Sequence, residues 1–287
     1  AASQTDDGNW QLYEPDALVE KTVTELSFVQ DGSLLMGTTY GGVRRWANGV
    51  AETLAANTAF DGEMISALFE DLDGDLWRGS FGKSVARFNG TQWQLFTAVP
   101  ATYEALIHEA AVSDPITLWL TTDEGLVSLT TVGERTVCQQ VTADYPGAAG
   151  LAADLTGQLW LVSERIVYRG NAAGFERTGT LALPVTAVAP DGAVWYVTQT
   201  DVVRVQGQQR LPVAHNLDPD TITALAIAPD GAVWLGTTAG VKVLQGGQWR
   251  TVSAADGLAS NHVTHIAIAA DGSVWVGTLG GVSWIRP

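Results

Sequence analysis

The sequence predicts an all-β fold, a seven-bladed β-propeller with four-stranded blades, from three observations. One phrase of two short apolar strands around a tight turn occurs seven times in 287 residues. The second strand contains a tryptophan in six of the seven copies, with Leu35 in the first. The copies recur every 35 to 42 residues, which leaves room for about four short strands each. The turn residues are Gly32, Gly74, Pro115, Gly157, Gly192, Gly231 and Gly272.

The turn is the clearest signal within each repeat. An Asp-Gly pair such as Asp191-Gly192 between two alternating apolar runs predicts a hairpin with a type I′ turn, because glycine adopts a positive φ without strain. The tryptophan that follows, here Trp195, is large and flat and suits the space between two packed sheets. Small or hydroxyl residues, commonly Gly-Thr, then end the second strand.

A third and an outer strand complete each predicted blade. Residues 240–244 and 281–285 are typical third strands, with apolar side chains after a glycine. Residues 93–96 and 249–252 are typical outer strands and begin with tryptophan. Seven such sheets arranged radially leave only short edges exposed, which is the advantage of a propeller over an open sheet.

The two ends of the sequence are expected to meet in one blade. The seventh copy stops at Pro287 after three strands and lacks its outer strand. Residues 9–13 read like residues 248–252, so we expect the N-terminal segment to complete the last blade and close the ring. Because a ring without both ends is incomplete, we expect a single domain over residues 1–287.

The composition excludes several classes of function. Asp and Glu number 31 against 15 Lys and Arg, which gives a formal charge of −16. A nucleic-acid-binding protein needs a basic surface, so no nucleic-acid partner is expected. No apolar run approaches the roughly 20 residues that span a bilayer, so no membrane insertion of this segment is expected. The lone Cys138 has no partner for a disulfide within the chain.

The seventh repeat carries the most specific motif. It reads Asp-Gly-Leu-Ala-Ser-Asn-His-Val-Thr-His-Ile over residues 256–266 and Asp-Gly-Ser-Val-Trp-Val-Gly-Thr over residues 271–278. This phrase resembles the two-component regulator propeller repeat. The resemblance implies the sensory part of a hybrid sensor kinase and an extracytoplasmic location, periplasmic or secreted. The small polar residues after Ala1 fit export, although a shortened chain would look the same. In that family a kinase follows, so this chain is either cut from a longer sensor or a free-standing relative.

The innermost strand of each blade is expected to line the central channel, where side chains of several blades converge. Six residues before each turn Asp, or its replacement, lies one ring of positions: Glu25, Ala67, His108, Gly150, Val185, Ala224 and His265. Glu25, His108 and His265 could bind a divalent metal or transfer protons, but we favour a plain channel wall with no metal and no cofactor. His262 could turn inward from the preceding loop, whereas His215 is expected in a solvated loop.

The loops that leave the second strands are expected on the same face and offer further ligand-binding candidates. They combine aromatic, charged and amide side chains, which suit a sugar or a peptide, although ordinary solvated loops have the same composition. The candidates are Tyr40, Phe81, Lys83, Asp123, Glu124, Glu164, Arg165 and Gln199. The acidic balance favours a neutral or cationic ligand, unless Lys83 and Arg165 dominate locally.

These observations favour a non-catalytic sensing or binding module that recognises a small molecule, a glycan or a partner protein at the axial face. No nucleophile elbow, phosphate loop, His-Glu-x-x-His or Cys-x-x-Cys motif occurs. One alternative is an enzyme that resembles streptogramin lyases, seven-bladed propellers that use a metal, a histidine and a glutamate. Their second strands end in Phe-Thr-Glu, whereas the strands here end in Gly-Thr or similar residues. The other alternative is a protein-interaction scaffold.

Overall fold

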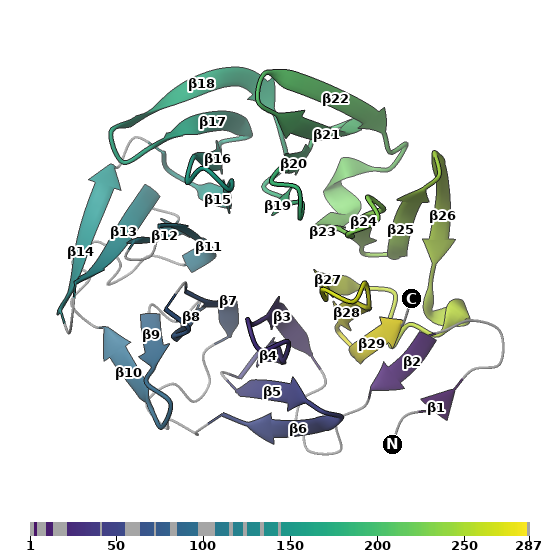
Figure 1. Cartoon of the computed structure of the whole chain (residues 1–287). Coiled ribbons are helices and arrows are strands. Elements are labelled where there is room, and N and C mark those ends of the chain that lie inside the picture. The colour runs from purple at the N-terminus through teal and green to yellow at the C-terminus, as the bar shows by residue number, and fades with distance from the viewer. Residues whose placement is uncertain are drawn as a thin grey trace.

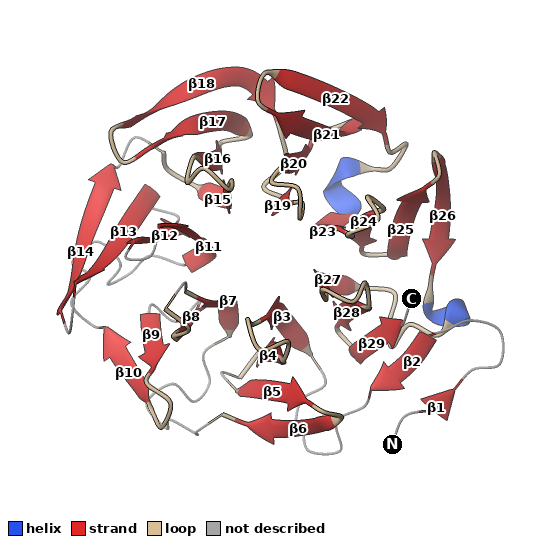
Figure 2. Ribbon diagram, viewed as in Figure 1, coloured by secondary structure: helices blue, strands red, loops and turns tan. Residues whose placement is uncertain are grey.

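The computed structural model shows seven antiparallel sheets arranged in a ring (Figure 1). Figure 2 shows that strands make up most of the ring. The described residues also form the short 3₁₀ helices η2 (Pro219–Thr221) and η3 (Ala254–Asp256). The predicted seven-bladed all-β propeller is confirmed. Within the described part of the chain, no helix is long and apolar enough to cross a membrane. The described residues are 3–4, 10–13, 22–40, 42–54, 64–71, 73–80, 85–96, 107–114, 117–122, 125–132, 135–142 and 145–285.

Each blade contains an inner, a second, a third and an outer strand, in order from the axis (Figure 1). The inner strands are β3 (Val23–Phe28), β7 (Ile65–Glu70), β11 (Ile107–Asp114), β15 (Ala148–Ala153), β19 (Thr186–Val188), β23 (Ile222–Ile227) and β27 (Val263–Ile268). The second strands are β4 (Leu34–Thr38), β8 (Leu76–Ser80), β12 (Thr117–Thr122), β16 (Leu159–Ser163), β20 (Val194–Val197), β24 (Val233–Thr237) and β28 (Val274–Thr278). The third strands are β5 (Val43–Ala47), β9 (Val85–Phe88), β13 (Gly125–Val132), β17 (Ile166–Asn171), β21 (Asp201–Gln206), β25 (Gly240–Gln245) and β29 (Gly281–Ile285). The outer strands are β6 (Val50–Thr53), β10 (Trp93–Phe96), β14 (Arg135–Thr142), β18 (Gly174–Leu181), β22 (Gln209–Ala214), β26 (Gln248–Val252) and β2 (Trp10–Tyr13).

The N-terminal strand closes the ring, as predicted. Residues Trp10 to Tyr13 of β2 pair with β29 in continuous antiparallel register, so the last blade takes its outer strand from the other end of the chain. A short strand, β1 (Ser3–Gln4), extends this sheet by a fifth strand that the sequence did not indicate. Beside the junction, the rings of Trp275 and Trp284 stack with centroids 5.2 Å apart.

The hairpin turns differ from the predicted type I′ geometry. In the first blade the Gly32 N–H donates to the Val29 carbonyl at 2.8 Å, and within this turn only the glycine has a positive φ, 80°. The Asp31 Oδ1 instead accepts a hydrogen bond from the Ser33 N–H at 2.9 Å. Equivalent side-chain bonds form at Asp191, Asp230 and Asp271. The aspartate therefore serves as an acceptor that fixes the turn, and only the glycine supplies the left-handed conformation.

Glycines in the second strands allow neighbouring blades to approach closely. A Cβ added at Gly37 would lie 2.6 Å from Cγ2 of Ile65, on the inner strand of the next blade. The Gly-Thr ending thus makes room for a β-branched side chain. In the third blade Thr121 replaces the glycine, and the residue that corresponds to Ile65 in the following blade is the smaller Ala148. Both of these side chains are buried, so the larger residue on one side of the blade interface is compensated by a smaller residue on the other side.

The inner strands share a β-bulge that the sequence reading missed. In the first blade the ladder to the second strand skips Thr24, and it skips one residue at the same place in β7, β11, β15, β23 and β27. In the fifth blade, Val197 exchanges backbone hydrogen bonds with Leu183 and Val185. The skipped residue there is Pro184, which fits because proline has no N–H to pair.

Candidate functional site

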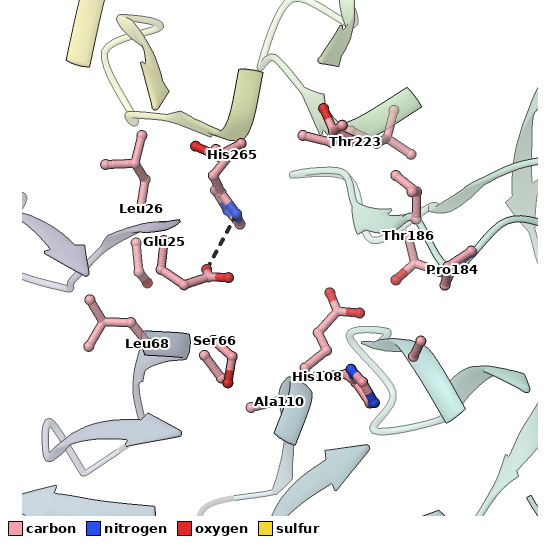
Figure 3. Close-up of a pocket in the computed structure, with 18 of the residues that line it drawn as sticks. Glu25, Leu26, Ser66, Leu68, His108, Ala110, Pro184, Thr186, Thr223 and His265 are labelled. Carbon is pink, nitrogen blue, oxygen red and sulfur yellow. Dashed lines mark ion pairs between the residues drawn. The ribbon is translucent and has the colours of Figure 1, made fainter. Parts of the chain in front are cut away.

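The inner strands of all seven blades surround a cavity of about 360 Å³ on the ring axis (Figure 3). A second hollow of about 280 Å³ extends it toward the start of the inner strands. None of the described residues that line either space is Lys or Arg. Five residues line both spaces: Glu25, Ser66, His108, Thr223 and Thr264. The cavity is therefore acidic, imidazole-bearing and rich in hydroxyl groups.

One of the predicted inner-strand ring positions, His108 in the third blade, is wrong. In β11 the residue that takes the ring position in the ladder is Glu109, paired with Thr121, and His108 is the skipped bulge residue. The prediction was wrong by one residue because the third turn is longer. Asp114 lies five residues before Trp119, whereas in every other blade the turn Asp, or its replacement, lies four residues before the Trp or its replacement Leu35. Counting ten residues back from Trp119 gives Glu109. The same count from Leu35 and from the tryptophans of the other second strands gives the other six ring positions as predicted.

Glu25 and His265 meet inside the cavity (Figure 3). His265 Nδ1 lies 3.3 Å from Glu25 Oε2, and the side chains are 35% and 18% exposed, respectively. Burial lowers the pKa of His265 to about 4. Burial, aided by the nearby carboxyl of Glu109, raises the pKa of Glu25 well above its usual value. Both directions favour the uncharged forms of the two side chains over an ion pair.

Glu109 is the second carboxyl in the cavity. Its Oε2 accepts a hydrogen bond from the Leu151 N–H of the next blade at 2.7 Å. Burial raises the pKa of Glu109 to about 8, and the bond from Leu151 opposes that rise. At pH near 7 this carboxyl is mostly protonated and can donate a hydrogen bond as well as accept one.

Four hydroxyl groups of the wall are buried or already paired. Thr24 Oγ1, Ser66 Oγ and Thr223 Oγ1 are buried and have no hydrogen-bond partner within the described residues. By contrast, Thr264 Oγ1 donates to the Val23 carbonyl at 2.6 Å and ties the last blade to the first. The oxygens of Thr24, Ser66 and Thr223 are covered by neighbouring atoms, so they are not open to a ligand in the cavity.

The remaining predicted site residues lie elsewhere. His262 lines the second hollow. Tyr40 is 61% exposed and Gln199 is also exposed, so neither is enclosed by the ring. Glu164 and Arg165 form an exposed two-residue turn with φ values of 47° and 67°. The other four candidates, Phe81, Lys83, Asp123 and Glu124, lie outside the described residues.

His215 is buried, which corrects the prediction of a solvated loop residue. Its exposed fraction is 3%. Nδ1 accepts a hydrogen bond from the Leu217 N–H at 3.1 Å, so the hydrogen is on Nε2, which lies 3.2 Å from the Thr198 carbonyl. The ring thus links two loops of the fifth blade and has a structural role.

Within the described ranges, no three His, Cys, Asp or Glu side chains are grouped so that they could hold one ion. Glu25, His108 and His265 share a cavity but do not form such a group. The chemistry that the described residues support is hydrogen bonding and proton exchange with a polar ligand.

Comparison with known proteins gives one sequence match and several matches of fold. Residues 257–280 match the family model described as two component regulator propeller. This match lies on the motif from which the resemblance was predicted. No curated protein sequence matches the chain significantly.

Solved structures with the same fold come from proteins of different function. The extracellular domain of a protein assigned as the hybrid two component system BT3049 from B. thetaiotaomicron has a TM-score of 0.80 at 14% identity. That match covers 98% of this chain, which spans only 41% of that one. A streptogramin B lyase matches at TM-score 0.78 and 14% identity, over 97% of this chain and 98% of its own. YCF48 bound to D1 peptide matches at TM-score 0.72 and 14% identity, over 100% and 97%.

At these identities the likeness shows the fold alone. The sequence match is more specific, since it falls on the seventh repeat, and the strands around it form the last of seven blades. The chain is therefore a seven-bladed β-propeller that carries a two-component regulator propeller repeat.

Proposed function

We propose that this protein is a non-catalytic ligand-binding module of an extracytoplasmic sensor, and that its axial cavity takes a small polar molecule that is neutral or cationic. One observation carries the proposal. Glu25, Glu109 and His265, from three different blades, line one cavity that contains no described Lys or Arg. Convergent polar groups in an enclosed space are the usual signature of a small-molecule site.

The protonation state of the cavity supports this ligand class. Without ligand, the raised pKa of Glu109, about 8, keeps its carboxyl mostly protonated near neutral pH, and a neutral ligand can accept its hydrogen bond. A cationic group would instead favour the ionised carboxylate and release a proton. An anion has no described cationic partner there, and the net charge of −16 opposes its approach.

The comparisons support the sensing role and the location. Among the matching structures is the extracellular domain of a protein assigned as a hybrid two component system, and the family model describes a two component regulator propeller. The chain spans 41% of that extracellular domain, so a sensor built like it would contain further parts.

A ligand panel read by thermal melting tests the proposal. Amino sugars and primary amines are compared with their N-acetylated, neutral counterparts and with sugar phosphates. We expect stabilisation by a neutral or cationic compound, because a ligand at about 100 times its Kd adds about 2.7 kcal/mol. Glu25→Gln and Glu109→Gln should weaken this shift, and the surface variant Glu52→Gln, on β6, should not.

Two results would count against the proposal. Stabilisation only by anionic compounds would contradict the ligand class. No shift with any compound would favour a partner protein, a role that has a precedent in the structure of YCF48 bound to D1 peptide.

The enzyme alternative has a specific observation in its favour, the full-length match to a streptogramin B lyase. It requires a metal, so elemental analysis of the purified protein distinguishes the two functions. We expect no stoichiometric transition metal and no change of Tm with chelator. A bound metal that is lost in His108→Ala and in His265→Ala would favour the enzyme.

A further inference from the structure

Two carboxyl groups from different blades face the same axial cavity. Glu25 lies on β3 of the first blade and Glu109 on β11 of the third, and both line the cavity of about 360 Å³. The two interact electrostatically, since the carboxyl of Glu109 contributes to the raised pKa of Glu25. No Lys or Arg of the described lining provides a counter-charge for either carboxyl. The positive charge that would let one of them ionise has to come from a ligand.

The other titratable side chains of the cavity are histidines. His265 on β27 lies beside Glu25, and burial lowers its pKa to about 4, so near pH 7 it is neutral and does not repel a cation. His108, the bulge residue of β11, lines both the cavity and the adjoining hollow, and His262 lines the hollow. The second, fourth, fifth and sixth blades contribute no titratable side chain to the described lining.

We propose that the axial cavity binds the ammonium group of a small primary amine between Glu25 and Glu109, and that one proton leaves the cavity when the cation binds. The inference rests on the function proposed above and narrows the ligand from a neutral or cationic molecule to an organic cation. An ammonium group has three N–H donors, enough for both carboxyl groups. Because a proton leaves as the cation enters, the net charge of the cavity is the same before and after binding, which avoids burying an uncompensated charge.

Glu109 is the carboxyl that gives up this proton. Its Oε2 already accepts a hydrogen bond from the Leu151 N–H at 2.7 Å, and such a bond favours the ionised form. Without a cation its pKa is about 8, so near pH 7 most molecules carry the proton that the ligand displaces. The O–H bond of Glu109 breaks, the proton passes to the buffer, and the ammonium group keeps its own three hydrogens. Glu25, beside the neutral His265, stays protonated and accepts a hydrogen bond through its carbonyl oxygen.

The volume of the cavity limits the size of the amine. A water molecule occupies about 30 Å³ in the liquid, so a cavity of about 360 Å³ holds roughly ten to twelve non-hydrogen atoms. The adjoining hollow of about 280 Å³ shares Glu25 and His108 with the cavity and leaves room for the rest of a longer molecule. A short-chain or single-ring amine therefore fits this space.

Calorimetric titration with 4-aminobutanol and with its neutral N-acetyl derivative tests the proposal. A primary alkylamine has a pKa close to that of lysine, about 10.4, so the amine stays cationic near neutral pH. The ionised fraction of Glu109 rises about eightfold between about pH 6.5 and about pH 7.5, so the Kd of the amine should fall by about the same factor. At about pH 7.5 the N-acetyl derivative should bind at least about tenfold more weakly than the amine.

Repeating the titration in buffers of different ionisation enthalpy counts the protons released. At about pH 7 we expect about 0.9 proton for each amine bound, which is the protonated fraction of a group with a pKa of about 8. In Glu109→Gln the amide can still accept the Leu151 hydrogen bond but cannot ionise, so proton release should disappear and the amine should bind at least about tenfold more weakly. Glu25→Gln should keep the proton release, and Glu52→Gln, an exposed carboxyl on β6, should match the wild type.

Three results would overturn the inference: amine binding without proton release, proton release that survives Glu109→Gln, or no saturable binding of the amine. His108→Gln and His262→Gln should keep the proton release, which excludes these histidines as its source. The proposed function is judged separately, by the melting panel. If a neutral compound of that panel binds and the amine does not, the cavity remains a ligand site and only the inference about the ammonium group fails.

Discussion

We expect the free energy of unfolding to fall as the pH rises, and Glu109→Gln should reduce this fall. Burial raises the folded-state pKa of Glu109 from 4.5 to about 8. A carboxyl with a raised pKa contributes stability that is complete below about pH 4.5 and is lost as the pH rises through about 8, because the unfolded chain gives up the proton first. The free energy of unfolding of the wild type should therefore fall across this window. Glutamine cannot ionise, so the variant lacks this part of the fall.

The expected size follows from the pKa shift. One pKa unit corresponds to about 1.36 kcal/mol, so the interval from about pH 6.5 to about pH 8 is worth at most about 2 kcal/mol. Glu109 lines a cavity that water can enter, and screening reduces the expectation to about 1 kcal/mol. The lower limit of pH 6.5 avoids His265. Its lowered pKa, about 4, makes the unfolded state take up a proton first, so its contribution is lost as the pH falls from about 6.5 to about 4.

Urea unfolding followed by tryptophan fluorescence measures the effect at several pH values between these limits. In Glu109→Gln the new side chain can still accept the Leu151 hydrogen bond through its amide oxygen, so the variant should fold. Glu52→Gln removes an exposed carboxyl from an outer strand and should follow the pH dependence of the wild type. If wild type and Glu109→Gln lose stability in parallel above pH 6.5, the raised pKa is refuted.

Two further predictions concern the packing of the ring. A Cβ at Gly236 would lie 2.6 Å from Val263 Cγ1, so Gly236→Ala should lower the free energy of unfolding by about 1–3 kcal/mol, and Val263→Ala in the same chain should return part of it. Strictly additive losses in urea unfolding would contradict this close contact. Deleting residues 1–13 leaves the edge of β29 unpaired and should lower the Tm by roughly 2–4 °C for each kcal/mol lost, with increased light scattering. An unchanged Tm would show that β2 does not close the ring.

The fold was predictable because its signals are local and repeated. The turn, the second-strand tryptophan and the interval between copies each point to a four-stranded blade, and together they give the number of blades. The bulge in the inner strands was missed although it breaks the alternation: the buried residues Val23 and Leu26 lie three positions apart instead of two, as do Val263 and Ile266. Pro184, just before β19, was a further indication, because a proline there needs a position without a ladder hydrogen bond.

The candidate site was predictable only in part. Glu25 and His265 were placed in the ring by counting from the turn, and the structure brings them within 3.3 Å. Glu109 was missed because the third turn is one residue longer, whereas the buried tryptophan is fixed by packing and is the safer reference point. His215 was misplaced because burial of a loop residue depends on contacts distant in sequence, here with Thr198.

The polar side chains that could bind a ligand occur where one blade differs from the repeat. At the ring position, small residues such as Ala67 and Ala224 satisfy the packing of the inner strands and offer nothing to a ligand. A carboxyl at the same position costs desolvation, and the raised pKa of Glu109 records that cost. The hydrogen bond from Leu151 and the packing of the regular blades offset that cost, so the carboxyl can persist there. Positions where one blade breaks a rule that the others obey are therefore where binding should be sought.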